Sequence, residues 1–159
     1  MYPRTILALS LALLGGLTSC GDDNNDPSPA TNKSALLTAK SWRITADQSV
    51  VVSGGTTVTN DDFTDLRACE KDDLIRFNAD KTITQDQGAS KCPDTSADPQ
   101  SQKDGNWDFN SDQTKLTMAD GSLAVVADVL ELSASTLKIK FSFTDDGDSY
   151  TQTTTYTAQ

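Results

Sequence analysis

Short apolar runs, separated by turn residues about every ten positions, dominate the chain after residue 33. The clearest run is formed by Leu137, Ile139, Phe141 and Phe143, which alternate with polar residues. A period of two is typical of a strand with one buried face, because successive side chains of a strand point to opposite faces. The pattern predicts an all-β fold, an antiparallel up-and-down barrel of about eight strands with short helical turns.

The other expected strands show the same alternation and are bounded by turn residues. The first begins at Trp42 and Ile44, and residues 50–52 either continue it or form its partner. Further strands are expected around residues 75–77, 83, 106–109, 116–118, 123–132 and 149–157. Within 123–132, Leu130 and Leu132 are expected on one face of the strand.

Two short helical turns and one long loop complete the expected elements. The helical turns are predicted at residues 34–39 and 61–66, the second with an aspartate as its N-cap. Residues 86–104 contain prolines, glycine and many small polar side chains, so a loop is expected there.

The amino terminus has a different pattern, which is that of an export signal. Arg4 precedes an apolar run over residues 6–14, and small residues then lead into Cys20. The run is too short for a comfortable membrane span. The residues before Cys20 resemble the bacterial lipobox, whose chemistry is lipid attachment to the cysteine and cleavage in front of it. The resemblance implies a signal peptide over 1–19 and a lipid anchor at Cys20.

A polar stretch follows the predicted lipid site. Residues 20–33 contain no large apolar side chain, which predicts a flexible acidic tether in front of a single domain over 34–159. Gly21 follows the cysteine, so the aspartate that retains some lipoproteins in the inner membrane is missing. We therefore expect an outer-membrane lipoprotein of a Gram-negative bacterium, on either the periplasmic or the surface side.

The three cysteines fit this reading. If Cys20 carries lipid, Cys69 and Cys92 remain as a pair in a compartment that permits disulfides. Closing a loop of about 24 residues would remove roughly 3 kcal/mol of unfolded-state freedom. The alternatives are weaker, because two cysteines without histidine do not complete an ordinary zinc site and their spacing is not that of a redox dithiol.

Composition excludes several functions. The chain has 23 acidic and 13 basic residues, and its formal net charge of −10 disfavours nucleic-acid binding. The absence of histidine removes the commonest general base and the commonest metal ligand. We therefore expect no enzyme and no cofactor. A carboxylate-dependent hydrolase is a remote alternative.

A resemblance to a known family covers roughly residues 37–156. The residues that carry it are Leu37, Trp42, Cys69, Glu70, Lys71, Asp72, Asp73, Ile75, Phe77, Asp80, Gly88, Cys92, Gly105, Trp107, Leu130, Glu131, Leu132, Ser133, Thr136 and Leu137. Together they resemble the bacterial lipocalin-like domain found in lipoproteins. The resemblance implies a lipocalin-like barrel whose mouth accepts a small apolar molecule, and it brings no defined ligand or catalytic residue. Lys81 stands where the family often has glycine, which predicts a turn without a positive φ.

The candidate ligand site is the interior of the barrel. Its large inward candidates are Trp42, Phe77, Trp107, Phe109, Phe141 and Phe143, which either line a pocket or fill the core. Residues 145–148 suggest a calcium site, but the residue preferences of a hairpin turn explain them better. The acidic residues within 70–73 suggest a catalytic acid group, but solvated charge at the rim of the barrel explains them better.

The sequence therefore predicts a lipid-anchored, non-catalytic protein that binds a small hydrophobic ligand. The alternative is a filled barrel that serves as a structural or protein–protein interaction module of the envelope, with an envelope protein as its partner.

Overall fold

Nine antiparallel strands form one continuous sheet in the computed structural model, which describes residues 32–159. The strands are β1 (Ser41–Ser53), β2 (Thr56–Asp61), β3 (Leu74–Phe77), β4 (Thr82–Asp86), β5 (Ser101–Phe109), β6 (Lys115–Asp120), β7 (Leu123–Leu132), β8 (Thr136–Asp145) and β9 (Asp148–Ala158). The helices are α1 (Lys33–Thr38), α2 (Asp62–Asp65) and the 3-10 turn η1 (Pro93–Thr95). None of the helices in residues 32–159 has the length and hydropathy that crossing a membrane requires. The predicted signal peptide and Cys20 lie outside the described residues.

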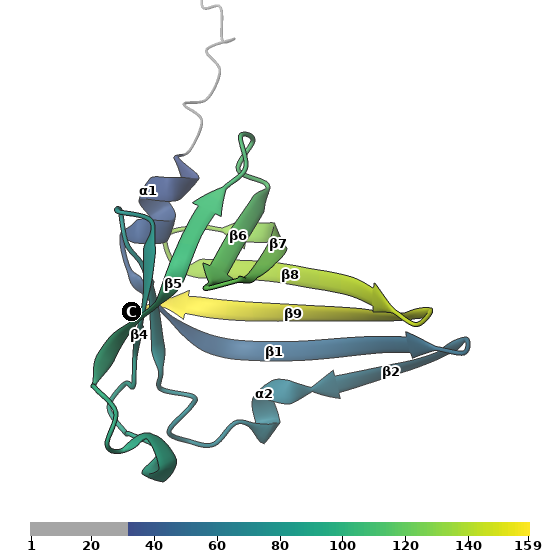
Figure 1. The fold of residues 1–159 in the computed structure, drawn as a ribbon, viewed down its shortest axis with the longest axis horizontal. Coiled ribbons are helices and arrows are strands. Elements are labelled where there is room, and N and C mark those ends of the chain that lie inside the picture. The colour runs from purple at the N-terminus through teal and green to yellow at the C-terminus, as the bar shows by residue number, and fades with distance from the viewer. Residues whose placement is uncertain (1–31) are drawn as a thin grey trace, which may run out of the picture. The chain divides into compact units, whose positions relative to one another are not determined.

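The sheet closes because β1 has partners on both of its edges. One edge pairs with β9 from Trp42 to Val52, and the other pairs with β3 over only three residues, from Ser41 to Arg43. Strand β1 and strands β3 to β9 thus form the predicted eight-stranded up-and-down barrel. Beyond β3, β2 takes over as the partner of β1. Figure 1 shows β8, β9, β1 and β2 extending together past the other strands as a projecting arm.

One half of the barrel is filled by apolar side chains. Its buried members are Leu37, Trp42, Phe77, Ile83, Trp107, Leu116, Ala127, Leu137 and Ile139. Helix α1 covers this half: Leu37 is fully buried, and its carbonyl oxygen accepts a 2.9 Å hydrogen bond from the Trp42 indole Nε1. Phe77 and Phe109 each pack edge-on against Trp107, with ring centroids 6.0 and 5.7 Å away. We call this half the closed end.

Two expected boundaries change in the structure. Residues 50–52 continue the first strand and do not form its partner, because β1 is a single strand from Ser41 to Ser53. The predicted loop over 86–104 is too long, since β5 begins at Ser101. Gln85 pairs with Gln102, and the Gln87 backbone N–H donates to the Gln100 carbonyl oxygen at 2.9 Å. Polar residues can form this ladder because backbone groups make the strand pairing.

Two expectations about side-chain and backbone geometry are wrong. Leu130 and Leu132 do not share a buried face: the β7–β8 register shifts between Val129 and Glu131, and Leu130 is 50% exposed. Lys81 does adopt a positive φ, 69°. Its ammonium lies 4.0 Å from the centroid of the Trp107 ring and 2.9 Å from Asp108 Oδ1, and these contacts offset the cost of the left-handed backbone.

Candidate functional site

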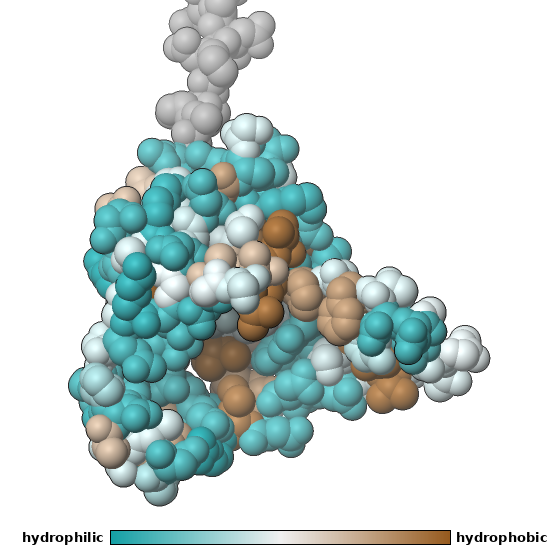
Figure 2. All heavy atoms as spheres, in the orientation of Figure 1, coloured by the Kyte–Doolittle hydropathy of each residue, from teal (hydrophilic) through white to brown (hydrophobic). Residues whose placement is uncertain are grey.

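Two adjoining cavities in the barrel border the closed end, and Trp42, Ala127 and Ile139 of that end take part in their lining. The first has a volume of about 270 Å³ and the second about 340 Å³, and Ile44 and Tyr156 line both. The first is lined mainly by Trp42, Leu66, Leu74 and Ile75 from one side of the barrel. The apolar lining of the second consists of Met118, Val125, Ala127, Ile139 and Phe141. Figure 2 shows hydrophobic side chains at the bottom of a hollow in this part of the surface.

A β-bulge decides which side chains of β1 face the hollow. Ile44 pairs with Tyr156, but the register shifts before Ala46, so Thr45 is an extra residue. After the bulge, Asp47 lies opposite Thr154 and joins the lining of the second cavity. A strictly alternating strand would have turned Asp47 outward. The bulge therefore places a carboxylate inside the barrel.

Asp47 is fixed in the second cavity by two hydrogen bonds. Gln152 Nε2 and Thr154 Oγ1 each donate to one of its carboxylate oxygens at 2.8 Å. The nearby Tyr156 hydroxyl has no hydrogen-bond partner among residues 32–159. Tyr156 is half-buried, and the desolvation of its hydroxyl, followed by the charge of Asp47, raises its pKa to about 12. The hydroxyl is thus a protonated donor in the hollow.

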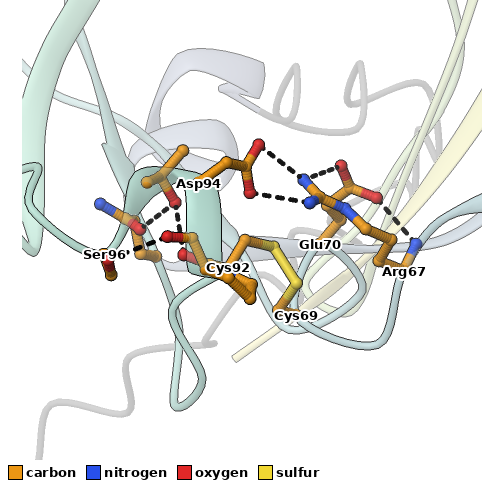
Figure 3. A network of polar contacts seen from close by, with 9 residues as sticks. Arg67, Cys69, Glu70, Cys92, Asp94 and Ser96 are labelled. Carbon is orange, nitrogen blue, oxygen red and sulfur yellow. Dashed lines mark hydrogen bonds and ion pairs between the residues drawn. A yellow bond between two sulfur atoms is a disulfide. The ribbon is translucent and has the colours of Figure 1, made fainter.

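The rim of the first cavity is held by the disulfide. Cys69 and Cys92 are bonded, with Cα atoms 5.2 Å apart, so the predicted disulfide is confirmed. Beside it, the Arg67 guanidinium contacts Glu70 Oε1 at 2.8 Å and Asp94 Oδ1 at 2.7 Å (Figure 3). These contacts hold the pKa values of both carboxyls below their usual range, chiefly through hydrogen bonds from Arg67. Disulfide and ion pairs join the segment before β3 to the loop before β5.

Asp73 is the second carboxylate on this rim. It lines the first cavity together with Glu70 and Gln85. Partial burial, followed by the charges of Asp72, Glu70 and Asp86, raises the pKa of the Asp73 carboxyl. Among residues 32–159, no cation forms an ion pair with it. The rim therefore has a negative potential.

The six aromatic residues predicted for the barrel interior lie in three different places. Trp42 lines the first cavity and Phe141 the second. Phe77, Trp107 and Phe109 belong to the closed end, where they fill the core. Phe143 lies on the arm, is 47% exposed and stacks on Tyr150 at 4.7 Å. Their binding of a ligand stays a prediction, and Trp42 and Phe141 are the members placed to contact one.

Sequence reasoning left out the polar residues of the hollow, Asp47, Gln152, Thr154 and Tyr156. It placed Glu70 and Asp73 at a rim, without joining them to a cavity. Gln152, Thr154 and Tyr156 share one face of β9, but the opposite face is polar as well, so the sequence shows no contrast between the two faces. Alternation from Trp42 and Ile44 would predict an outward Asp47, because the sequence does not reveal the bulge at Thr45.

Metal chemistry has no visible site in the described part of the chain. Residues 32–159 contain no group of three or more histidine, cysteine, aspartate or glutamate side chains arranged to hold a metal ion. Residues 145–148, which suggested calcium, form the tight β8–β9 turn, in which Asp145 pairs with Asp148. Asp146 and Gly147 there have positive φ, as turn chemistry requires.

The eight-stranded up-and-down barrel, closed at one end and hollow at the other, defines a class of proteins whose fold is suited to binding small molecules. Comparison with known families agrees. The family described as the lipocalin-like domain matches residues 38–139, and the chain belongs to this family. Members of this family generally have a fold that serves binding rather than catalysis. A search of curated proteins finds no match.

Proposed function

We propose that the protein is a lipid-anchored envelope lipoprotein that holds a small hydrophobic molecule, without catalysis, in the open half of its barrel. The observation that carries this proposal is the pair of adjoining, mainly apolar cavities that share Ile44 and Tyr156. Their combined space reaches the size at which small-molecule pockets begin, roughly 300 Å³ and above. Apolar lining with a few polar groups is the usual composition of such pockets.

The alternative is a filled barrel that acts only as an interaction module. Exposed Leu123, Val126 and Leu130 on β7 would supply a contact surface for it. The idea that side chains fill the whole barrel has less support, because the apolar core fills only the closed end. The two ideas differ in whether a ligand occupies the hollow.

The binding experiment uses the full chain with Cys20→Ser, which removes the thiol that would carry lipid. The neutral fluorescent probe N-phenyl-1-naphthylamine is titrated into this protein and into two further variants. Thr154→Trp places a large side chain in the second cavity, whereas Thr153→Trp adds the same side chain on the other face of β9. We expect probe binding to weaken at least about ten-fold in Thr154→Trp only. Absence of probe binding, or equal affinities in both variants, would contradict the carrier proposal.

The anchor and location rest on the sequence around Cys20 and need their own test. Fractionation of host membranes should find the wild-type protein in the outer membrane and the Cys20→Ser protein released from it. Protease added to intact cells then distinguishes the surface side from the periplasmic side. Retention of Cys20→Ser in membranes would refute the lipid anchor. Native mass spectrometry of the wild-type protein would identify a co-purifying ligand.

A further inference from the structure

Basic residues of the barrel strands lie on the outer face, whereas acidic residues lie on both faces. Arg43 lies between the inward residues Trp42 and Ile44, and Lys138 and Lys140 flank the inward Ile139. These cations therefore point outward. Among residues 32–159, no lysine or arginine lines either cavity, whereas Asp47, Glu70 and Asp73 do. The hollow is thus an apolar space whose charged groups are all acidic.

The three carboxylates differ in how far the protein itself neutralises them. Asp47 accepts its two hydrogen bonds from neutral donors, Gln152 and Thr154. Glu70 shares the single charge of Arg67 with Asp94, so this group of three keeps a net negative charge. Asp73 has no ion-pair partner in the described residues, and the pKa of its carboxyl is raised by partial burial first and then by the neighbouring acids. The rim therefore retains uncompensated negative charge at Asp73.

Aromatic and hydrogen-bonding groups lie beside these charges. Trp42 and Tyr156 line the first cavity together with Glu70 and Asp73. A cation near the face of a tryptophan or tyrosine ring is attracted by the ring quadrupole. The Tyr156 hydroxyl oxygen can also accept a hydrogen bond from an ammonium N–H. An apolar chain attached to such a head group would contact Ile44, which lines the first cavity and also the second.

We infer that the hollow selects amphiphiles with a cationic, ammonium-type head group and an alkyl or similarly apolar body, and that it discriminates against fatty acids. The inference rests on the proposed function, because it names the chemical class of ligand for the same cavity. Asp73 and Glu70 at the rim attract the ammonium group, and the apolar body lies between Trp42, Ile44 and Tyr156. A carboxylate head would meet acids at the rim and inside the hollow, where no lysine or arginine of residues 32–159 lines either cavity.

The test compares three ligands of equal chain length: n-decylammonium, decanol and decanoate. Each displaces N-phenyl-1-naphthylamine from the full chain with Cys20→Ser at about pH 7, where the amine and the acid are both ionised. We expect n-decylammonium to bind at least about ten-fold more tightly than decanoate, and the affinity of decanol to lie between the two. The ratio should shrink as salt is added, because the rim is open to solvent.

Two matched variants locate the effect. Asp73→Asn removes one charge at the rim, and Asp120→Asn makes the same chemical change at an exposed position that lines neither cavity. We expect Asp73→Asn to reduce the ammonium-to-carboxylate ratio several-fold, with the affinity for decanol measured in each variant as the neutral reference. Asp120→Asn should leave the ratio unchanged.

The outcomes separate the two proposals. If the probe and decanol bind but the amine has no advantage over the acid, or if both variants change the ratio equally, the charge selectivity is refuted while the carrier function stands. If neither the probe nor any of the three ligands binds, the carrier function itself fails. A ten-fold preference that depends on Asp73 supports both.

Discussion

Replacement of Gly88 by alanine tests how the chain after β4 is held against the rim of the first cavity. Gly88 has a φ of +60°, and an added Cβ would lie 2.2 Å from the Asp72 backbone oxygen. The Gly88 N–H donates to Asp86 Oδ1 at 3.0 Å, and its carbonyl oxygen accepts from Gln100 Nε2 at 2.9 Å. The position therefore combines a left-handed backbone with a close backbone approach, and only glycine satisfies both.

The matched control is Gly121→Ala, in the turn between β6 and β7. Gly121 has nearly the same φ, +56°, but its added Cβ would meet nothing within 4 Å. The left-handed conformation alone costs an alanine roughly 1 to 2 kcal/mol, which both variants share. The clash at Gly88 adds about 1 to 3 kcal/mol, because backbone atoms rather than a flexible side chain must move. We expect Gly88→Ala to be the less stable variant by that difference.

Urea unfolding followed by tryptophan fluorescence measures the free energy of unfolding, since Trp42 and Trp107 are both buried. Equal losses in Gly88→Ala and Gly121→Ala would refute the close approach of residues 72 and 88. Equal m-values in the three proteins are needed for the comparison, because a changed m-value would indicate a changed native or unfolded state.

Three further predictions concern the disulfide and two titrating groups. Joint replacement of Cys69 and Cys92 by alanine should lower stability by about 3 kcal/mol and Tm by roughly 10 °C in calorimetry; an unchanged Tm would contradict it. The native pKa of Tyr156 lies above the unfolded value, so native stability should fall between pH 10 and about 12, and Tyr156→Phe should remove this part of the slope. The raised pKa of Asp73 means that its ionisation opposes folding, so Asp73→Asn should stabilise the protein at neutral pH by less than about 1 kcal/mol. That gain should disappear below the unfolded pKa, near pH 4, and a gain that persists there would exclude the electrostatic cause.

The strands and the disulfide could be predicted from the sequence. Strands show a local alternation of apolar and polar residues, and the disulfide follows from the number of cysteines. Leu137, Ile139 and Phe141 lie on the inner face as their alternation predicted. Cys69 and Cys92 were paired by elimination, once Cys20 was assigned to lipid. The barrel class followed from strand number, since eight alternating strands are enough to close a sheet.

Bulges are the main reason that the site was predicted only in part. The register shifts at Thr45 and at Leu130 each exchange inner and outer faces further along the strand. A bulge depends on the partner strand, which the local sequence does not reveal. Asp47 was therefore missed as a residue of the hollow, and Leu130 was wrongly expected on the same face as Leu132. Lys81 shows a similar limit, because the Trp107 ring that stabilises its left-handed backbone comes from another strand.

The separation of the barrel into a filled and a hollow half follows from where polar residues occupy inward positions. At the closed end the inward side chains are apolar, and they pack around Leu116 and Leu137, both fully buried. In the other half, Asp47 and Gln152 face inward, and a carboxylate whose hydrogen-bond donors are all neutral is costly to bury away from water. Collapse of this half onto itself would bury the Asp47 charge, and this cost opposes filling of the hollow by the protein's own side chains. Under the proposed function, a ligand whose positive charge compensates these acids would also gain apolar contacts, so that the acidic lining and the apolar volume would serve one binding site.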